Sequence, residues 1–148
     1  MTDVRIAVDA DVEKILVLFT EMHDETDYAN YPFTPIKASA AIRRWVSSDD
    51  AHVLLAVDGE DIVGAIVGTN NYSWGSDESI VSEQFFFVRK AYRNGGVASK
   101  LFEAFMAWAS SVAKHVHAGV SSGIGDSAES IYAKFGLYPT GRNFVKHY

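Results

Sequence analysis

The sequence contains no cysteine among its 148 residues. Disulfide bonds, thiolate zinc sites, iron–sulfur clusters and a cysteine nucleophile are therefore excluded. Only 3 prolines are present and no repeat is visible, so we expect one domain over residues 1–148. No apolar run approaches the ~18–20 residues that a membrane-spanning helix needs, and the N-terminal segment is acidic where a signal peptide would be basic. We therefore expect a cytoplasmic protein without a membrane partner.

The charged residues are unevenly distributed along the chain. Residues 1–83 carry 16 acidic and 5 basic side chains, whereas residues 84–148 carry 8 basic and 3 acidic ones. This asymmetry indicates two surfaces of opposite charge, although an uneven surface charge without a function gives the same pattern. The net charge of -6 argues against a nucleic-acid partner and against an anionic membrane.

Alternating and helical patterns of apolar residues predict a mixed α/β (α+β) sheet protein with the order β-α-α-β-β-β-α-β-α-β. The segments 24–36 and 70–79 have no such pattern and are expected to be loops. Strands are expected over 4–8, 52–57, 61–68, 80–88, 115–120 and 143–148, and helices over 12–19, 38–45, 97–112 and 127–134.

The most informative segment follows the predicted strand 80–88. It reads RNGGVA over residues 93–98 and leads directly into a long amphipathic helix. Glycine permits a positive φ, and a helix N-terminus offers unpaired N–H groups with a partial positive charge. The combination predicts a cradle for a phosphate or pyrophosphate, and an ordinary glycine turn before a core helix is the alternative. Neither a GxGxxG nor a GxxxxGK motif is present, which disfavours a dinucleotide site and a P-loop.

Two motifs resemble those of the GNAT superfamily of acyl-CoA-dependent N-acetyltransferases. Residues 93–98 match the family's pyrophosphate loop, R/Q-x-x-G-x-G/A, at every fixed position. Residues 125–137 (GDSAESIYAKFGL) are similar to the family's N-x-x-A-x-x-L/I-Y-x-x-x-G-F element and include Tyr132. Gly125 and Leu137 depart from that element, which has asparagine and phenylalanine there. The order of the predicted elements resembles the family over nearly the whole chain.

This resemblance implies a fold in which two central strands splay apart beside a bulge, with acetyl-CoA as co-substrate. It implies that main-chain groups at the end of strand 80–88 pair with pantetheine and that the glycine loop holds the pyrophosphate. It also places Tyr132 at the family's general-acid position, whereas a structural tyrosine between helix and strand is the alternative. The implied cofactor-binding residues are Phe86, Phe87, Val88, Arg93, Asn94, Gly95, Gly96, Val97, Ala98 and Ser99.

An amine that attacks a thioester directly also requires a base. An alkylamine with a pKa near ~10.4 is mostly protonated at neutral pH, so its proton must be removed. Glu83 is the leading candidate because it is the only acid in strand 80–88, and an exposed edge glutamate is the alternative. Strict alternation places Glu83 with Phe85 and Phe87, and the bulge decides which face it meets. Other residues that could hold a water for this purpose are Glu21, His23, Ser121 and Ser122.

Acidic and aromatic side chains are interleaved in the segments expected to form the acceptor side. Carboxylates and ring faces attract cations, so we expect a cationic amine on a small molecule or a protein. A solvated polar loop without a ligand is the alternative. The side chains concerned are Glu21, Asp24, Glu25, Asp27, Tyr28, Tyr31, Phe33, Tyr72, Trp74, Asp77 and Glu78.

These observations together predict an N-acetyltransferase that moves an acetyl group from acetyl-CoA to a primary amine. Two alternatives remain: a noncatalytic acyl-CoA-binding or regulatory module of the same fold, and an acyltransferase that acts on a tRNA-linked or other nucleic-acid-linked amine. The acidic first half of the chain disfavours the second. His115 and His117 have no obvious third ligand beside them, so we expect no metal site. Monomeric and homodimeric states are both open.

Overall fold

The computed structural model describes residues 1–120 and 125–148 of the chain. Within them, five strands form one sheet in the order β1-β2-β3-β4-β5. Neighbouring strands are antiparallel except β4 and β5, which are parallel. The strands are β1 (Asp3–Ile6), β2 (Ala51–Asp58), β3 (Asp61–Tyr72), β4 (Ser79–Val88) and β5 (His115–His117), and the helices are α1 (Val12–Glu25), α2 (Pro35–Ser47), α3 (Val97–Val112) and α4 (Gly125–Lys134).

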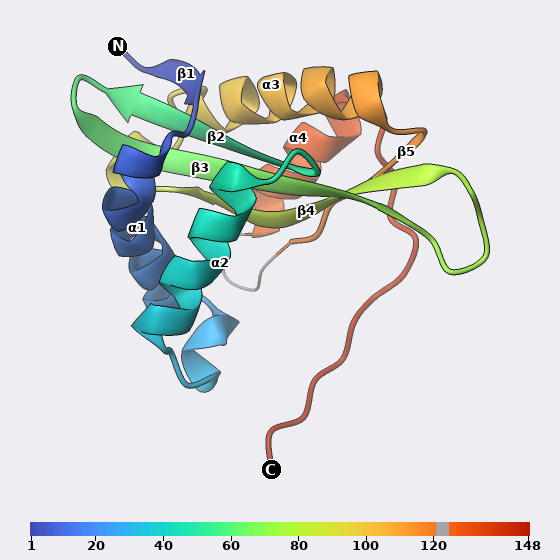
Figure 1. Ribbon diagram of the computed structural model, residues 1–148, viewed down its shortest axis with the longest axis horizontal. Helices are drawn as coiled ribbons and strands as arrows, with labels where there is room; N and C mark the ends of the chain where they lie inside the picture. The colour runs from blue at the N-terminus through green and yellow to red at the C-terminus, as the bar shows by residue number, and fades with distance from the viewer. Residues whose placement is uncertain (121–124) are drawn as a thin grey trace.

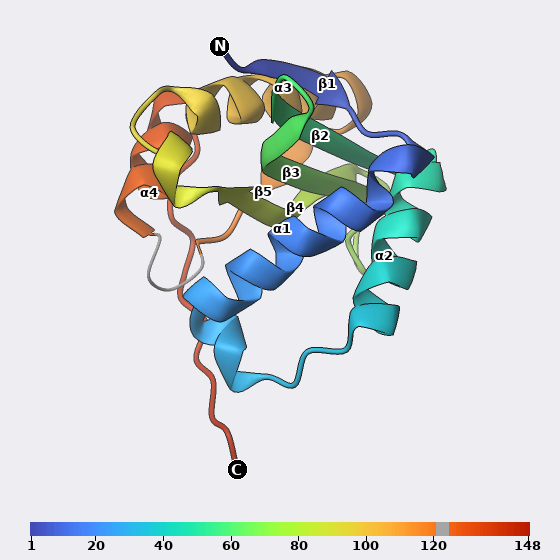
Figure 2. The same ribbon diagram turned by 90° about the vertical axis from the view of Figure 1, so that its left-hand side faces the viewer.

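The helices cover both faces of this sheet. Helices α1 and α2 lie on one face, and α3 and α4 lie on the other (Figure 1, Figure 2). The side chains of β4 alternate between the two layers: Phe85 and Phe87 belong to the core cluster of α1 and α2, whereas Phe86 and Val88 belong to that of α3 and α4. A strand covered on both faces is apolar at nearly every position, which explains the continuous run at the end of β4.

Helix α3 connects the two parallel strands. Parallel neighbours require a crossover connection, and α3 supplies it between β4 and β5. The inner face expected for this helix comprises Val97, Leu101, Phe105, Trp108 and Val112. The first three are buried and Trp108 is half-buried, whereas Val112 in the last turn is 40% exposed, so the expectation is wrong there. A Cβ at Gly68 of β3 would lie 2.5 Å from the Phe105 ring, so a glycine there allows α3 to approach the sheet closely.

Strand β4 separates from β5 partway along its length. Among the described residues, the two strands pair from Ile80 to Ser82, whereas β4 continues to Val88. On the other side of β4, the register with β3 shifts so that Gln84 has no partner, which is a β-bulge. Both the expected splay of the central strands and the expected bulge are confirmed.

Three expectations about the elements are corrected. No strand forms over 143–148; this segment extends away from the sheet (Figure 1), and a strand requires a neighbouring backbone as well as an apolar pattern. The strand expected over 115–120 ends at His117. The third concerns both expected loops, which are shorter than 24–36 and 70–79. Helix α1 continues to Glu25, a short 3-10 helix, η2, follows at Asp27–Asn30, and α2 begins at Pro35, while β3 continues to Tyr72.

Candidate functional site

The bulge at Gln84 determines the face on which Glu83 lies. Phe85 packs with α1 and α2, and strict alternation would place Glu83 beside it. Glu83 is instead paired with Gly68. A Cβ at Gly68 would point to Phe105 of α3, and residues paired across two strands point to the same face of the sheet. The extra residue therefore transfers Glu83 to the layer of α3 and α4, which is also the layer of Tyr132.

The backbone of Gly119 joins the two residues predicted to be catalytic. The Gly119 N–H donates a hydrogen bond to Oε2 of Glu83 at 3.2 Å, and its carbonyl accepts one from the Tyr132 hydroxyl at 2.7 Å. The Tyr132 ring is only 7% exposed. Its centroid lies 4.9 Å from that of Phe102 and 6.4 Å from that of Phe86. Packing therefore fixes the ring, and the hydroxyl alone can exchange partners.

The surroundings of both groups change their proton affinities. Burial raises the pKa of Glu83 from its ordinary 4.5 to about 7, although the hydrogen bond from Gly119 opposes the rise. Burial, and then the nearby Glu83 carboxylate, raise the pKa of Tyr132 well above its usual value. Near neutral pH, Glu83 can therefore accept a proton and Tyr132 remains a protonated donor.

In the described residues, the open side of β4 carries main-chain groups that no neighbouring strand pairs with, and among them the Val88 carbonyl accepts a hydrogen bond from Arg93. The Arg89 N–H donates to the Val63 carbonyl at 2.8 Å, which fixes the alternation of hydrogen bonds between β3 and β4. By that alternation, the main chain of Phe87 faces β3, whereas the N–H and carbonyl groups of Phe86 and Val88 point toward the open side. Phe86 and Val88 are thus the two predicted main-chain positions that face outward.

The loop after β4 has the backbone conformation of an anion cradle. Helix α3 begins directly after Gly96, which has a φ of 83°, and Asn94 has a φ of 69°. The first hydrogen bond within α3 runs from the Lys100 N–H to the Gly96 carbonyl, so the N–H groups of residues 97–99 precede the helical ladder. Left-handed residues at Asn94 and Gly96, together with free N–H groups, suit a phosphate. The loop therefore fits the pyrophosphate of a CoA thioester.

The side chain of Arg93, which was predicted to bind cofactor, is directed toward α1. Its Nη2 donates to the Glu25 carboxylate at 2.7 Å, and its Nε donates to the Val88 carbonyl at 2.8 Å. Two other residues considered for the base are engaged as well. Glu21 accepts two hydrogen bonds from Arg89, and His23 Nε2 contacts the Tyr31 carbonyl at 2.8 Å. Ser121 and Ser122 lie outside the described residues.

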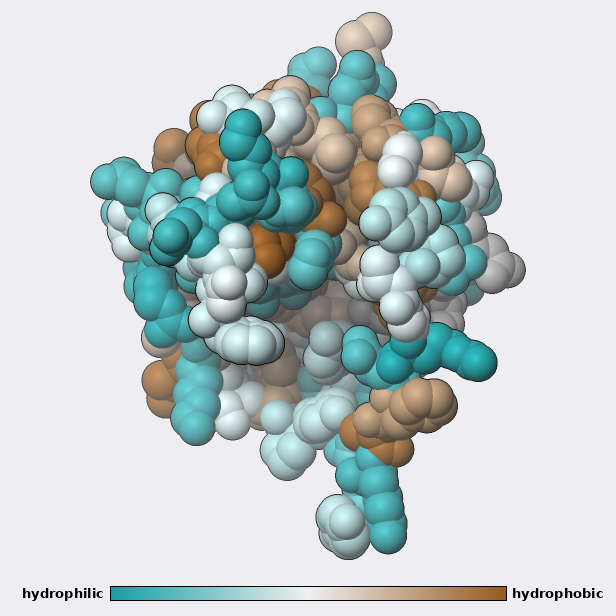
Figure 3. All heavy atoms as spheres, turned by 90° about the vertical axis from the view of Figure 1, so that its right-hand side faces the viewer, coloured by the Kyte–Doolittle hydropathy of each residue, from teal (hydrophilic) through white to brown (hydrophobic). Residues whose placement is uncertain are grey.

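A cavity of about 360 Å³ adjoins Glu83 on the open side of β4. Figure 3, viewed from the side of the β3–β4 hairpin, shows polar side chains around a hollowed centre, with the C-terminal tail extending below it. The cavity is lined by Met22, Asp27, Tyr28, Tyr31, Glu83, Gln84, Phe85, Phe86, Gly119, Val120, Asn143, Phe144 and Val145.

The acidic and aromatic set predicted for the acceptor is divided by the fold. Asp27, Tyr28 and Tyr31 line the cavity. The hairpin between β3 and β4 instead extends away from it (Figure 1), and Trp74 is fully exposed there. The nearby Glu78 contacts His115 at 2.5 Å. The expectation that both segments form one surface is therefore wrong for the hairpin.

Sequence reasoning missed Gly119 and the ion pairs that join α1 to the segment after β4. Nothing in the local sequence distinguishes Gly119, because its role depends on main-chain groups. The ion pairs had only a partial signal. Glu21 and Glu25 lie four positions apart and therefore on one face of a helix, but nothing in the local sequence shows that Arg89 and Arg93 meet that face.

A sheet opened between two parallel strands, with a glycine loop at the start of the crossover helix, defines an N-acetyltransferase type of fold. The acetyltransferase (GNAT) family matches residues 15–137 of the chain. The protein therefore belongs to the GNAT family of acetyltransferases, as the motifs predicted. Comparison with curated proteins finds no match.

Solved structures with the same fold have diverse descriptions. Aminoglycoside N-acetyltransferase AAC(6')-Iy in complex with CoA is 17% identical, with a TM-score of 0.77 over 100% of this chain and 95% of that one. A ribosomal-protein-alanine N-acetyltransferase of Brucella melitensis is 11% identical, with a TM-score of 0.73 over 100% and 99%. A transcriptional regulator of Bacillus halodurans is 16% identical, with a TM-score of 0.81 over 100% of both chains. At these identities the likeness concerns the fold.

In the described part of the chain, no helix is both long enough and apolar enough to cross a membrane.

Proposed function

We propose that this protein transfers the acetyl group of acetyl-CoA to a primary amine by direct attack within a ternary complex. The observation that carries the proposal is the bridge through Gly119, which places Glu83 and Tyr132 together beside the open side of β4. The thioester supplies an activated acetyl group. The absence of cysteine excludes an acyl-cysteine route, which leaves direct attack as the simplest one.

Glu83 and Tyr132 have complementary roles in this reaction. Glu83 removes the proton from the ammonium group of the acceptor, directly or through a water, and its pKa of about 7 suits a base near neutral pH. Tyr132 donates its phenolic proton to the departing thiolate, for which its hydroxyl must leave the Gly119 carbonyl. The acceptor ammonium loses two protons in all. Glu83 takes the first before the attack. As the C–N bond forms and the C–S bond breaks, Tyr132 gives its proton to the thiolate, and the second proton of the acceptor nitrogen restores the Tyr132 hydroxyl.

The chain can hold the co-substrate largely with backbone groups. The N–H groups of residues 97–99 at the start of α3 accommodate the pyrophosphate. The N–H and carbonyl of Phe86 and the N–H of Val88 pair with the pantetheine amides, because they have no strand partner on the side of β5 in the described structure; the Val88 carbonyl already accepts from Arg93. Because main-chain N–H and carbonyl groups make these contacts, the side chains at these positions do not need to contact the co-substrate.

The acceptor in this proposal is a cationic amine on a small molecule or a protein. The cavity beside Glu83 is lined by Asp27, Tyr28 and Tyr31; carboxylates and aromatic rings attract a cation by charge and by ring-face contact. Other acids of α1 contribute less to this attraction, because Arg89 and Arg93 neutralise Glu21 and Glu25.

Release of free thiol from acetyl-CoA, measured against an amine panel, tests the proposed reaction. The panel contains spermidine, an aminoglycoside, a peptide with a free α-amine, and glutamate as an anionic amine. We expect turnover with cationic members and a rate that decreases with added salt. CoA binding without turnover of any amine would identify a noncatalytic module instead. Preference for an aminoacyl-tRNA, with steep salt dependence, would favour a nucleic-acid acceptor.

Asp27→Asn tests the predicted class of acceptor. We expect it to raise the KM for the cationic acceptor by about 3- to 10-fold, as expected for one partly screened charge, and to leave the KM for acetyl-CoA unchanged. Asp49→Asn is the matched control, because Asp49 is an exposed carboxylate in the turn before β2 and does not line the cavity. Equal KM values for the acceptor in both variants would contradict a role of Asp27 in cation binding.

A further inference from the structure

Two ion pairs with matching spacing join α1 to the segment between β4 and α3. Nε and Nη2 of Arg89 donate to the two carboxylate oxygens of Glu21 at 2.9 and 2.8 Å. One helical turn further along α1, Nη2 of Arg93 donates to Glu25 at 2.7 Å. The four side chains are only 27–38% exposed. The short 3-10 helix η3 (Lys90–Tyr92) separates the two arginines and sets their spacing.

Arg93 is held on three sides. Besides the pair with Glu25, its Nε donates to the Val88 carbonyl at 2.8 Å, and its guanidinium lies 5.2 Å from the centre of the Phe87 ring. The Val88 carbonyl is one of the outward main-chain groups at the open side of β4. A planar guanidinium with contacts along two edges and one face has a fixed orientation, so Arg93 links the end of β4 to α1 at the first residue of the glycine loop.

The elements that Arg93 links belong to the two halves of the proposed site. The glycine loop and the open side of β4 form the proposed acyl-CoA half. The C-terminal part of α1 and the following η2 contribute Met22, Asp27 and Tyr28 to the wall of the acceptor cavity. Glu25 lies between Met22 and Asp27 in the sequence, so its position and the cavity wall are set by the same stretch of backbone.

We propose that Arg93, through Glu25, is a positioning residue that couples the acyl-CoA half of the site to the acceptor half. This inference rests on the proposed function, because it assigns CoA to the glycine loop. Binding of CoA orders the glycine loop, which begins at Arg93, and the ion pair between Arg93 and Glu25 transmits this order to the end of α1 and to η2. By linkage, an acceptor that immobilises α1 favours CoA binding by the same factor.

The alternative is that the Arg93 side chain contacts the pyrophosphate itself. The two roles predict opposite effects of Glu25→Gln on the affinity for CoA. Glu25→Gln removes a negative charge that competes for Arg93, so a direct contact would leave CoA binding equal or tighter. A positioning role requires the pair with Glu25, so the same substitution weakens CoA binding. The sign of the change in Kd therefore separates the two roles.

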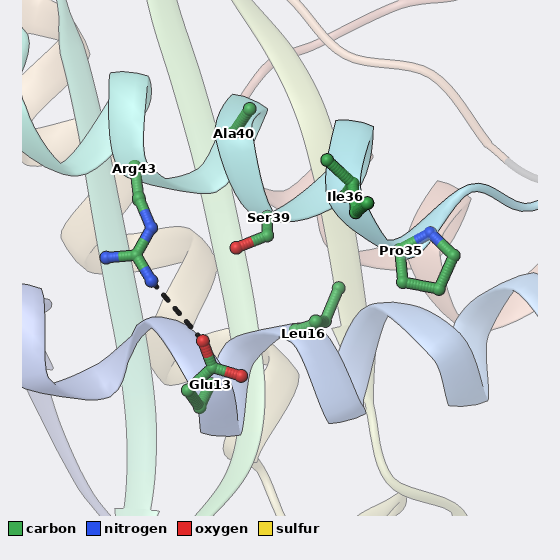
Figure 4. Close-up of a pocket in the computed structure, with 7 residues that line it drawn as sticks. All are labelled: Glu13, Leu16, Pro35, Ile36, Ser39, Ala40 and Arg43. Atoms are coloured by element: carbon green, nitrogen blue, oxygen red, sulfur yellow. Dashed lines mark hydrogen bonds and ion pairs between the residues drawn. The ribbon is translucent and has the colours of Figure 1, made fainter.

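The test compares wild type, Glu25→Gln and Glu13→Gln by calorimetric titration with CoA. Glu13 is the matched control because it also forms an ion pair from α1, with Arg43 of α2 at 3.3 Å, beside a separate groove (Figure 4). We expect Glu25→Gln to raise the Kd for CoA about fivefold, a typical coupling factor, and Glu13→Gln to leave it unchanged. An equal or lower Kd in Glu25→Gln would overturn the inference. A wild type that binds no CoA would instead refute the proposed function.

Hydrogen exchange measured by mass spectrometry supplies a second readout that needs no acceptor. In wild type and in Glu13→Gln, addition of CoA should slow amide exchange over residues 21–30, at the end of α1 and in η2. In Glu25→Gln, at a CoA concentration that saturates the variant, this protection should be lost while protection of the glycine loop remains. Equal protection of residues 21–30 in all three proteins, or none in wild type, would overturn the coupling. Because Glu25 is partly exposed, the substitution itself should have little effect on folding.

Discussion

Glu83→Gln should abolish most of the activity and at the same time stabilise the protein. The substituted amide keeps the size of the side chain and an oxygen that accepts from the Gly119 N–H, but it cannot take a proton from the acceptor amine. Removal of a general base lowers turnover by about 10²- to 10⁴-fold. We therefore expect kcat/KM at pH 8 to decrease by at least about 100-fold. The rise of kcat/KM with pH through about 7 in wild type should be absent in the variant.

The gain in stability follows from the burial of the carboxylate. The folded pKa of Glu83, about 7, lies above its ordinary 4.5, and each pKa unit corresponds to about 1.4 kcal/mol. Between pH 4.5 and about 7 the folded state therefore keeps a proton on Glu83 that the unfolded state has lost. The buried carboxylate does not destabilise the folded state below about pH 4.5. Its destabilising effect grows as the pH rises and is complete above about pH 7. Allowing for solvent screening, Glu83→Gln should raise the free energy of unfolding at pH 8 by about 1–3 kcal/mol.

Thermal unfolding at several pH values and thiol release together measure both effects. The gain at pH 8 corresponds to an increase of roughly 3–10 °C in Tm for a chain of this size, and it should vanish near pH 4. Glu103→Gln, an exposed position on α3, is the control for loss of one negative charge. The reasoning is refuted if Glu83→Gln keeps the wild-type rate and pH profile, or if it lowers the Tm at pH 8.

Two further substitutions address the general acid and the glycine loop. Tyr132→Phe should lower kcat by about 10- to 100-fold while the Tm changes by only a few degrees, because the ring packing remains; an unchanged kcat in the thiol-release assay would exclude Tyr132 as the acid. Gly96→Ala should destabilise the fold by about 1–2 kcal/mol, because a φ of 83° is unfavourable for alanine, and it should weaken CoA binding. Gly141→Ala, at a position with open space and no positive φ, is the control, and urea unfolding with calorimetric titration measures both; equal stability of the two variants would contradict the strain argument.

Helices, strands and the glycine loop could be predicted from the sequence where a local pattern of residues determines them. The apolar period of residues 97–112 predicted α3, and the glycines at 95 and 96 predicted a cradle at its start, because a positive φ and free N–H groups are local properties. The terminal strand expected over 143–148 failed for the converse reason. An alternating pattern shows that a segment is able to pair, but pairing also needs a neighbouring edge, which no local pattern supplies.

For the two predicted catalytic residues, the sequence identified the residues themselves, whereas the fold brought them together. Tyr132 was identified from a motif, and Glu83 from being the only acid in its strand. Their meeting could not be read from the sequence, because it depends on the bulge at Gln84, which turns Glu83 to the layer of α4, and on main-chain groups of Gly119. A bulge results from the register between two strands, and that register is set by side chains distant in the sequence.

The charged residues show most clearly what composition determines and what only the tertiary structure decides. The absence of cysteine and the acidic first half of the chain are properties of composition; the first excludes an acyl-cysteine route, and the second led us to expect a cationic acceptor. Composition could not show which acids remain available to a ligand. Folding neutralises Glu21 and Glu25 with Arg89 and Arg93, each 68 residues away in the sequence, and leaves Asp27 at the cavity. Pairing of charges depends on distances of a few ångströms, and these exist only once the sheet and helices are packed together.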